Sequence, residues 1–168
     1  KTGFFLDQRE NRKLLGEFSK GKKVLNTFCY TGGFSIYAMS AGAELVTSVD
    51  ISQKAVDLAA SNMELNFPNT NHKAVADDVF NFMKEHTQQY DVIVLDPPAF
   101  AKSIKSKHTA TQAYKRLNIA GLKALAPNGI LFTFSCSQVI DDVLFYNTIA
   151  AAAIETGRNI RVLHKLEQ

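Results

Sequence analysis

Short apolar runs alternate with longer amphipathic runs along most of this chain of 168 residues. Strands are predicted at residues 24–28, 45–49, 72–76, 92–95, 130–134 and 160–163, and helices between them at 34–41, 53–66, 79–86, 111–125 and 141–156. Such alternation is typical of consecutive β-α units around a parallel sheet. We therefore expect an α/β fold of the Rossmann-like type, with a mostly parallel sheet and helices on both faces.

A further helix is predicted ahead of the first strand. Asp7 offers a capping carboxylate, and Glu10 follows three residues later. This spacing is typical of the first turn of a helix. An apolar face then follows, formed by Leu14, Leu15 and Phe18.

Residues 100–108 interrupt the alternation, because they are too polar and basic for a core element. We expect an exposed loop there, after the fourth strand. Basic side chains in and beyond this segment are candidates for phosphate contacts, although single residues of this kind are more often solvated surface charges. They are Lys102, Lys105, Lys107, Lys115 and Arg116.

Length and composition favour one domain with a substantial core, since 46% of the residues are hydrophobic. The net charge of +3 is compatible with nucleic acid and also common elsewhere. Cys29 and Cys136 lie in unrelated contexts, which predicts neither a disulfide nor a metal site and favours a reducing, cytoplasmic location. No membrane span is predicted. The start at Lys1 suggests a piece of a longer protein.

A paired glycine follows the first predicted strand, within Tyr30-Thr31-Gly32-Gly33-Phe34. Glycine lets the backbone approach a ligand closely, and the next helix offers its N–H groups there. Asp50 ends the second strand, where a carboxylate can accept both hydroxyls of a ribose. The spacing G-x-G-x-x-G is absent, which counts against a nicotinamide enzyme. An ordinary turn and a helix cap remain the alternatives.

Carboxylates also follow the third and fourth predicted strands. Asp78, with Asp77 close behind, is a candidate acceptor for an adenine amino group, and helix capping is equally compatible with either residue. Asp96-Pro97-Pro98 forms a turn stiffened by proline, suited to holding a planar base beside a methyl donor. The alternative for this motif is a stiff loop in which Asp96 caps a local group.

Cys136 follows the fifth predicted strand, in Phe134-Ser135-Cys136-Ser137. Carbon 5 of cytosine is a poor nucleophile, and a thiolate that adds at carbon 6 activates it. Cys136 is therefore the candidate nucleophile, with Asp96 at the base edge as the second catalytic candidate. A buried, inert thiol is the alternative for Cys136, and Cys29 is predicted to be a packing residue.

The chain resembles the class I S-adenosylmethionine-dependent RNA methyltransferases, in the group that contains the cytosine-C5 enzymes of the 23S rRNA large subunit methyltransferase I family. The resemblance rests on the opening segment 2–12, the turn 28–35, Asp78-Val79-Phe80, Asp96-Pro97-Pro98-Ala99-Phe100 and Phe134-Ser135-Cys136-Ser137. It implies S-adenosylmethionine as cofactor, S-adenosylhomocysteine as product, and a cofactor-binding role for the opening helix. The predicted cofactor residues are Phe5, Asp7, Gln8, Arg9, Phe28, Tyr30, Thr31, Gly32, Phe34, Asp50, Ile51, Asp77, Asp78, Asp96 and Pro97.

The resemblance also implies 23S ribosomal RNA as partner, with no metal. Full-length relatives carry an N-terminal PUA-type RNA-binding domain and a longer C-terminus, so residues 1–168 are expected to be the methyltransferase domain alone, without the last strand or strands of its sheet. The oligomeric state stays open, with a homodimer of the full-length protein as one expectation. Many RNA cytosine-C5 enzymes have a cysteine where this chain has Ala99. Guanine-N7 methylation, another ring-nitrogen target, a module that binds nucleotide or RNA without catalysis and a reductase-type domain remain alternatives.

Overall fold

The computed structural model describes residues 6–101 and 103–166. Five strands are present in these residues: β1 (Lys23–Thr27), β2 (Leu45–Asp50), β3 (His72–Ala76), β4 (Tyr90–Leu95) and β5 (Leu125–Thr133). The helices are α1 (Arg9–Glu17), α2 (Gly33–Ser40), α3 (Gln53–Asn66), α4 (Val79–Glu85), α5 (Lys107–Ala124) and α6 (Asp142–Thr156), with a short 3-10 helix at Ile104–Ser106. The predicted α/β class is confirmed.

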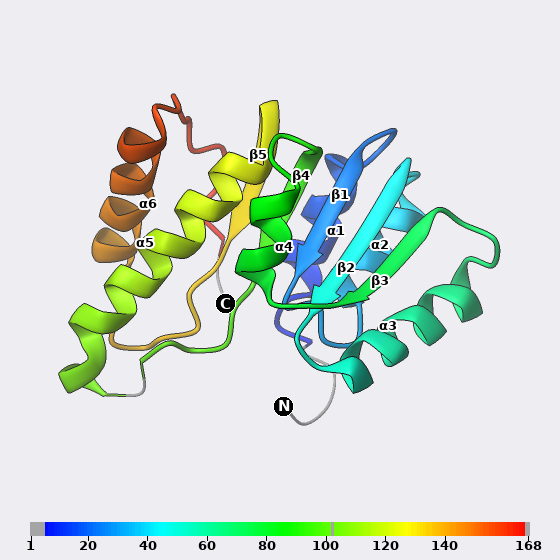
Figure 1. Cartoon of the computed structure of the whole chain (residues 1–168), viewed down its shortest axis with the longest axis horizontal. Helices are drawn as coiled ribbons and strands as arrows, with labels where there is room; N and C mark the ends of the chain where they lie inside the picture. The colour runs from blue at the N-terminus through cyan, green and yellow to red at the C-terminus, as the bar shows by residue number, and fades with distance from the viewer. Residues whose placement is uncertain (1–5, 102, 167–168) are drawn as a thin grey trace.

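The strands form one parallel sheet in the order β3-β2-β1-β4-β5. The chain leaves β1 toward one edge and returns to β4 on its other side, so the strand order reverses between β1 and β4. In open parallel sheets, ligands bind outside the carboxyl ends of the strands at this point of reversal. These ends lie at the bottom of Figure 1, where the strand arrows point.

Helices cover both faces of the sheet (Figure 1). Helices α1, α2 and α3 contribute Leu15, Phe34 and Met63 to one core, together with Val24 of β1. Helices α4 and α5 pack on the opposite face around another core, whose members include Leu25, Val79, Phe82 and Leu117. Since adjacent strand residues point to opposite faces, Val24 packs into the first core and Leu25 into the second. Helix α6 packs against α5 through Leu122 and Ala152.

Two local predictions are wrong. Asp7 does not cap the first helix: Gln8 holds the N-cap position, its side chain makes no capping hydrogen bond, and α1 begins at Arg9. Residues 160–163 form no strand, because no neighbouring backbone in the described part of the chain pairs with them. A strand needs a partner for its N–H and C=O groups, and the pattern of Ile160 and Val162 does not supply one.

The predicted loop at 100–108 is largely structured, which is a further correction. Ala101 is buried, residues 104–106 form the 3-10 helix, and α5 begins at Lys107 rather than at the predicted Thr111. The first turn of α5 has polar, exposed side chains on most of its surface, so its sequence resembles a loop. Among residues 6–101 and 103–166, no helix is long and apolar enough to cross a membrane.

Candidate functional site

The turn after β1 has a strained backbone. Phe28, Tyr30 and Gly32 all have positive φ angles, of 51°, 48° and 82°. Residues other than glycine adopt this region at an energetic cost, and such strain is concentrated at functional sites. At Gly32 a Cβ would also lie 3.1 Å from the Cβ of Ala59 in α3, so this position requires glycine. The backbone of the turn is therefore tightly specified.

Asp50 fastens this turn to the end of β2. Its Oδ2 accepts a hydrogen bond from the Tyr30 N–H at 3.1 Å, and its Oδ1 accepts one from the Ser52 N–H at 3.0 Å. A carboxylate has about four lone-pair positions, so each oxygen can accept another donor. Asp50 is half-buried, at the carboxyl edge of the sheet. It can therefore serve the turn and a ligand hydroxyl at the same time.

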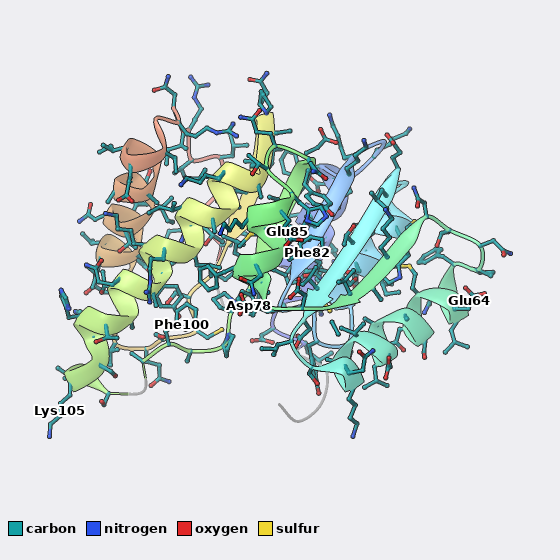
Figure 2. All side chains as sticks on the ribbon, in the orientation of Figure 1. Glu64, Asp78, Phe82, Glu85, Phe100 and Lys105 are labelled. Carbon is teal, nitrogen blue, oxygen red and sulfur yellow. The ribbon has the colours of Figure 1, made fainter. Side chains whose placement is uncertain are left out.

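Asp77 and Asp78 follow β3 at the same edge. The Asp77 N–H donates to the Asp50 carbonyl at 3.1 Å, and Asp77 Oδ1 accepts from the Asp78 N–H at 2.7 Å. Asp78 Oδ1 accepts from the N–H groups of Phe80 and Asn81 and so caps α4. Figure 2 shows Asp78 at the start of that helix. Asp78 therefore caps a helix, as the alternative interpretation of the sequence had it. The cap uses Oδ1, and Oδ2 can accept a hydrogen bond from another donor.

Cys136 and Asp96 meet at the ends of β5 and β4. The Phe134 N–H donates to the Leu95 carbonyl at 3.0 Å and continues the pairing of the two strands. Cys136 Sγ then lies 3.9 Å from Asp96 Oδ1. Cys136 is exposed, whereas Cys29 is buried, as predicted for a packing residue. An accessible thiol and a carboxylate therefore share one side of the point where the strand order reverses.

The opening segment is described from Leu6 onward, and the predicted cofactor residue Phe5 lies outside the described residues. Asp7 and Arg9 are exposed. Gln8 is buried, and its Oε1 accepts a hydrogen bond from Asn11 Nδ2 at 2.8 Å. Exposed Asp7 and Arg9 remain predicted cofactor residues, and Gln8 has a structural partner within α1.

The apolar members of the predicted set divide by burial. Phe34 is buried and packs against Phe134, with ring centroids 5.8 Å apart, so its side chain supports the turn from below. Phe28 is half-buried against the core on the α4 side. Pro97 is buried. Ile51 is 76% exposed next to Asp50, where an exposed apolar side chain suits contact with the flat face of a base.

The sequence reasoning missed a chain of buried hydroxyls beneath the turn. Asn26 Nδ2 donates to Ser35 Oγ at 2.9 Å, Ser35 Oγ lies 2.7 Å from Ser48 Oγ, and Ser48 Oγ lies 2.8 Å from His72 Nε2. Desolvation by burial lowers the pKa of His72 below its ordinary value of 6.5. The sequence signal that could have revealed this network is the presence of Asn26 and Ser48 at buried positions of predicted strands. The chain ties β1, α2, β2 and β3 together.

Two hollows lie away from the predicted site residues. One, of about 670 Å³, lies between α3 and β3 and includes His72 in its wall. The other, of about 650 Å³, lies at the amino ends of the strands, next to Thr47 and Tyr90. Neither is lined by a predicted site residue, because the predicted site lies at the opposite, carboxyl edge of the sheet. A ligand at the carboxyl edge would therefore be recognised by the hydrogen-bond donors and acceptors there, and neither hollow would enclose it.

The donor set suits a ligand that carries a ribose and an ionised amino-acid group. Asp50 offers acceptors for a vicinal diol, and the N-terminus of α2 at Gly33 offers N–H donors for a carboxylate. In the described residues, no group of three His, Cys, Asp or Glu side chains could hold a metal ion.

Comparison with known proteins agrees with this donor set. The family of S-adenosylmethionine-dependent methyltransferases matches residues 1–167. Proteins named ribosomal RNA large subunit methyltransferase I match the whole chain, with 46% identity in Aeromonas hydrophila and 43% in Shewanella amazonensis. The chain spans 43% of the length of each of these two relatives.

Solved structures show the same fold. A protein from Streptococcus mutans assigned as an S-adenosylmethionine-dependent methyltransferase superposes with a TM-score of 0.79 and 34% identity, over 91% of this chain and 41% of that one. A methyltransferase structure complexed with S-adenosylhomocysteine superposes with a TM-score of 0.77 and 34% identity, over 89% of this chain and 40% of that one. The chain therefore belongs to the family of S-adenosylmethionine-dependent methyltransferases.

Proposed function

We propose that this chain transfers a methyl group from S-adenosylmethionine to carbon 5 of a cytidine in 23S ribosomal RNA. The family supplies the cofactor, and the relatives named ribosomal RNA large subunit methyltransferase I support the RNA substrate. One observation carries the choice of carbon 5. An exposed cysteine, Cys136, lies beside Asp96 at the carboxyl edge of the sheet, the edge that also holds Asp50 and Asp78 of the predicted cofactor residues.

The cofactor would be held by the turn after β1 and by Asp50. When bound, S-adenosylmethionine supplies an electrophilic methyl group on a sulfonium. The Asp50 carboxylate would accept the ribose hydroxyls while it keeps its two backbone donors. Ile51 would cover one face of the adenine, and Asp77 or Asp78 would accept from its amino group. These assignments follow from position at the carboxyl edge.

Cys136 would act on the base. Its thiolate adds to carbon 6 of cytosine, so a sulfur–carbon bond forms and electron density shifts to carbon 5. Carbon 5 would then take the methyl group as the bond between the methyl and the sulfonium breaks, which leaves S-adenosylhomocysteine. A base removes the carbon-5 proton, and elimination breaks the bond between the sulfur and carbon 6, which regenerates the thiolate. Asp96, which lies 3.9 Å from the thiol, would hold the polar edge of the cytosine.

Ala99 favours a second candidate function, methylation of a ring nitrogen such as guanine N7. Many cytosine-C5 enzymes with a similar motif place a second cysteine at this position, and the half-buried Ala99 has no group that transfers protons. A ring nitrogen already carries a lone pair, so positioning is sufficient and no thiol is required. In that case Cys136 would be structural.

A trapping experiment separates these candidates. The whole protein that carries this chain is incubated with S-adenosylmethionine and 23S rRNA transcripts that contain 5-fluorocytidine. Fluorine blocks the loss of the carbon-5 substituent, so C5 methylation leaves a covalent complex between protein and RNA. We expect a complex stable in denaturing gels, with the crosslinked peptide containing Cys136.

Mass mapping of the unsubstituted RNA is the companion measurement. 5-Methylcytidine is the product expected from the proposal, and 7-methylguanosine without a covalent complex would overturn it. Binding of S-adenosylhomocysteine without methyl transfer to any rRNA would favour a module that does not catalyse.

A further inference from the structure

Ser137, the residue after Cys136, is buried and has its hydroxyl between two partners. Ser137 Oγ accepts a hydrogen bond from the Ala101 N–H at 3.1 Å. It also lies 2.9 Å from the hydroxyl of Tyr114, where either oxygen can donate. Ser137, Ala101 and Tyr114 have exposed fractions of 2%, 4% and 0%. The contact is therefore shielded from water, where hydrogen bonds are strong and unpaired groups are costly.

These partners come from three separate segments. Ala101 follows the turn 96–100 after β4, Tyr114 lies in the second turn of α5, and Ser137 belongs to the segment after β5. The hydrogen bonds join positions 36 and 23 residues apart in the sequence. The hydroxyl of Ser137 is thus the point where the ends of β4 and β5 are tied to one helix.

A small apolar cluster encloses this point. Ala101, Ala110, Tyr114 and Ile140 form a core separate from the two main ones. The ring of Tyr114 lies 4.7 Å from that of Phe100, measured between centroids, and Figure 2 shows Phe100 beside α5. The cluster fixes the ring of Tyr114, so its hydroxyl has a defined position.

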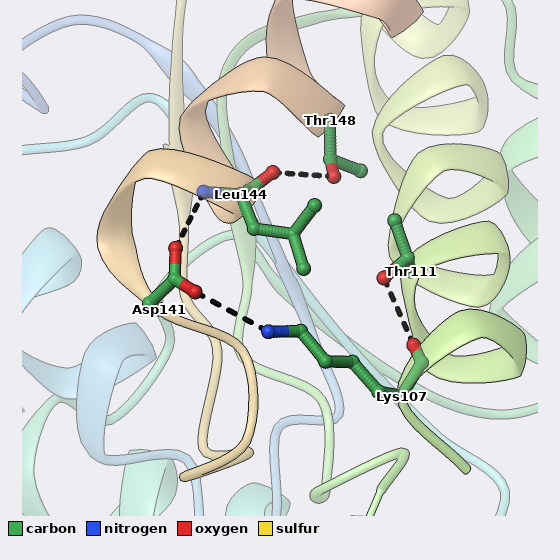
Figure 3. A network of polar contacts seen from close by, with 5 residues as sticks. All are labelled: Lys107, Thr111, Asp141, Leu144 and Thr148. Atoms are coloured by element: carbon green, nitrogen blue, oxygen red, sulfur yellow. Dashed lines mark hydrogen bonds and ion pairs between the residues drawn. The ribbon is translucent and has the colours of Figure 1, made fainter. Parts of the chain in front are cut away.

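An exposed ion pair near this buried contact joins α5 to the residue before α6. Lys107 Nζ and Asp141 Oδ2 are 3.3 Å apart on the surface, as Figure 3 shows. Exposed ion pairs of this kind contribute little to rigidity. It joins the first residue of α5 to Asp141, which lies in the segment after β5, five positions beyond Cys136. The buried hydroxyl contact is therefore the link that bears on the site.

We propose that Ser137 and Tyr114 are positioning residues that set the place of Cys136 relative to the turn of Asp96. The inference rests on the proposed function, in which the side chains of Cys136 and Asp96 act on one base. Ser137 is adjacent to Cys136, and its hydrogen bond to Ala101 closes the turn that begins at Asp96. Loss of the hydroxyl would free both segments while the turn after β1 and Asp50 keep their own contacts.

The test compares Ser137→Ala and Tyr114→Phe in the whole protein with matched controls. Thr148→Ala removes a buried hydroxyl from α6 that bonds only within its helix, to the Leu144 carbonyl. Tyr146→Phe removes a phenol hydroxyl from an exposed ring. Four quantities are measured: kcat and KM for rRNA methylation, the Kd of S-adenosylhomocysteine, and hydrogen-deuterium exchange of peptides that cover 96–101 and 134–140.

We expect kcat to fall on the order of tenfold in both variants, because small displacements of a reacting group are costly. KM and the Kd of S-adenosylhomocysteine should each change less than about twofold. For comparison, a tenfold change in Kd corresponds to about 1.4 kcal/mol of binding free energy. Exchange should accelerate in both peptides and not in the turn 28–33. The double variant should resemble Ser137→Ala, since Ser137→Ala already removes the one contact that Tyr114→Phe removes.

Two results would overturn the inference. One is unchanged kcat and unchanged exchange in Ser137→Ala. The other is a parallel loss of cofactor affinity, kcat and thermal stability, which indicates a general effect on folding. If the parent protein methylates no cytidine C5, the proposed function fails, and the exchange data still decide whether Ser137 braces the two segments.

Discussion

Cys136 Sγ lies 3.9 Å from Asp96 Oδ1, although the two residues are 40 positions apart in the sequence. The proximity arises because β4 and β5 are parallel neighbours, with Leu95 paired to Thr133. Two chains that run side by side and end together deliver the residues that follow them to the same place. A nucleophile and a group that binds the base can therefore come from separate loops without either loop being long.

Replacement of Cys136 tests the covalent step. We expect Cys136→Ala to lower the single-turnover rate of cytidine methylation by about 10³-fold or more, since loss of a nucleophile leaves only positioning. Thr148→Ala is the control, because the Thr148 hydroxyl bonds to the Leu144 carbonyl within α6. The rate is measured by transfer of a labelled methyl group to 23S rRNA. Full activity in Cys136→Ala would contradict the covalent mechanism.

Asp50→Asn should weaken cofactor binding. The amide keeps one acceptor oxygen, so it cannot serve the Tyr30 and Ser52 N–H groups and a ribose hydroxyl equally well. Hydrogen bonds to charged groups contribute about 1.5–3 kcal/mol, so we expect the Kd of S-adenosylhomocysteine to rise about 10- to 100-fold in calorimetric titration. Asp57→Asn, on the exposed face of α3, is the control. Equal affinities in both variants would remove Asp50 from the cofactor site.

His72 should make stability depend on pH. Burial lowers the pKa of His72 from its ordinary value of 6.5, so the unfolded chain takes up a proton at a pH where the folded chain does not. The free energy of unfolding should therefore fall as the pH decreases below about 6.5. Urea unfolding between about pH 5 and pH 8 measures this slope. The slope should be smaller in His72→Gln and unchanged in His108→Gln, whose side chain is exposed.

Asp141 should stabilise α6 through its charge. The Leu144 N–H, first, and Lys107, second, hold the pKa of Asp141 below its ordinary value of 3.8. The stabilisation is present above that value and is lost as the pH falls through the pKa of the folded state. We expect thermal stability to decrease from the parent to Asp141→Asn and further to Asp141→Ala, because asparagine retains a capping oxygen.

Salt provides the control for Asp141. Added NaCl should narrow the difference in thermal stability between the parent and Asp141→Asn, since the ion pair of Asp141 with Lys107 is exposed and is screened by salt. Asp142→Asn changes the neighbouring carboxylate, which pairs with Lys165, and leaves the cap intact. A larger loss in Asp142→Asn than in Asp141→Ala would show that the cap is not the stabilising contact.

Gly121 in α5 should tolerate no side chain. A Cβ there would lie 2.8 Å from Leu95 Cδ1 and 3.3 Å from Leu131 Cδ1, both in the sheet below the helix. Overpacking of a core typically costs about 1–3 kcal/mol, which we expect for Gly121→Ala in urea unfolding. Gly16→Ala is the matched change in a helix, where the new Cβ is 3.5 Å from Ala41 Cβ. It should be neutral or stabilising by up to about 1 kcal/mol.

Local sequence patterns were enough to predict the class of fold and most of the elements. Helix α3 and strand β3 have the predicted bounds, and Asp50, Asp77 and Asp96 lie at the strand ends where they were expected. These features depend on local periodicity and on turn residues, which a single sequence carries. The resemblance added the cofactor and the class of substrate, since residue types at strand ends do not name a ligand.

The hydrogen-bond partners of the polar groups could not be predicted from local patterns, because they depend on contacts between distant segments. Asp50 binds the Tyr30 N–H, and Ser137 binds both Ala101 and Tyr114, through contacts that span 20 to 36 residues. Residues 160–163 have the pattern of a strand and form none, because pairing is a property of two segments. A buried polar group such as the Ser137 hydroxyl needs a partner, and burial is set by neighbours that are distant in the chain.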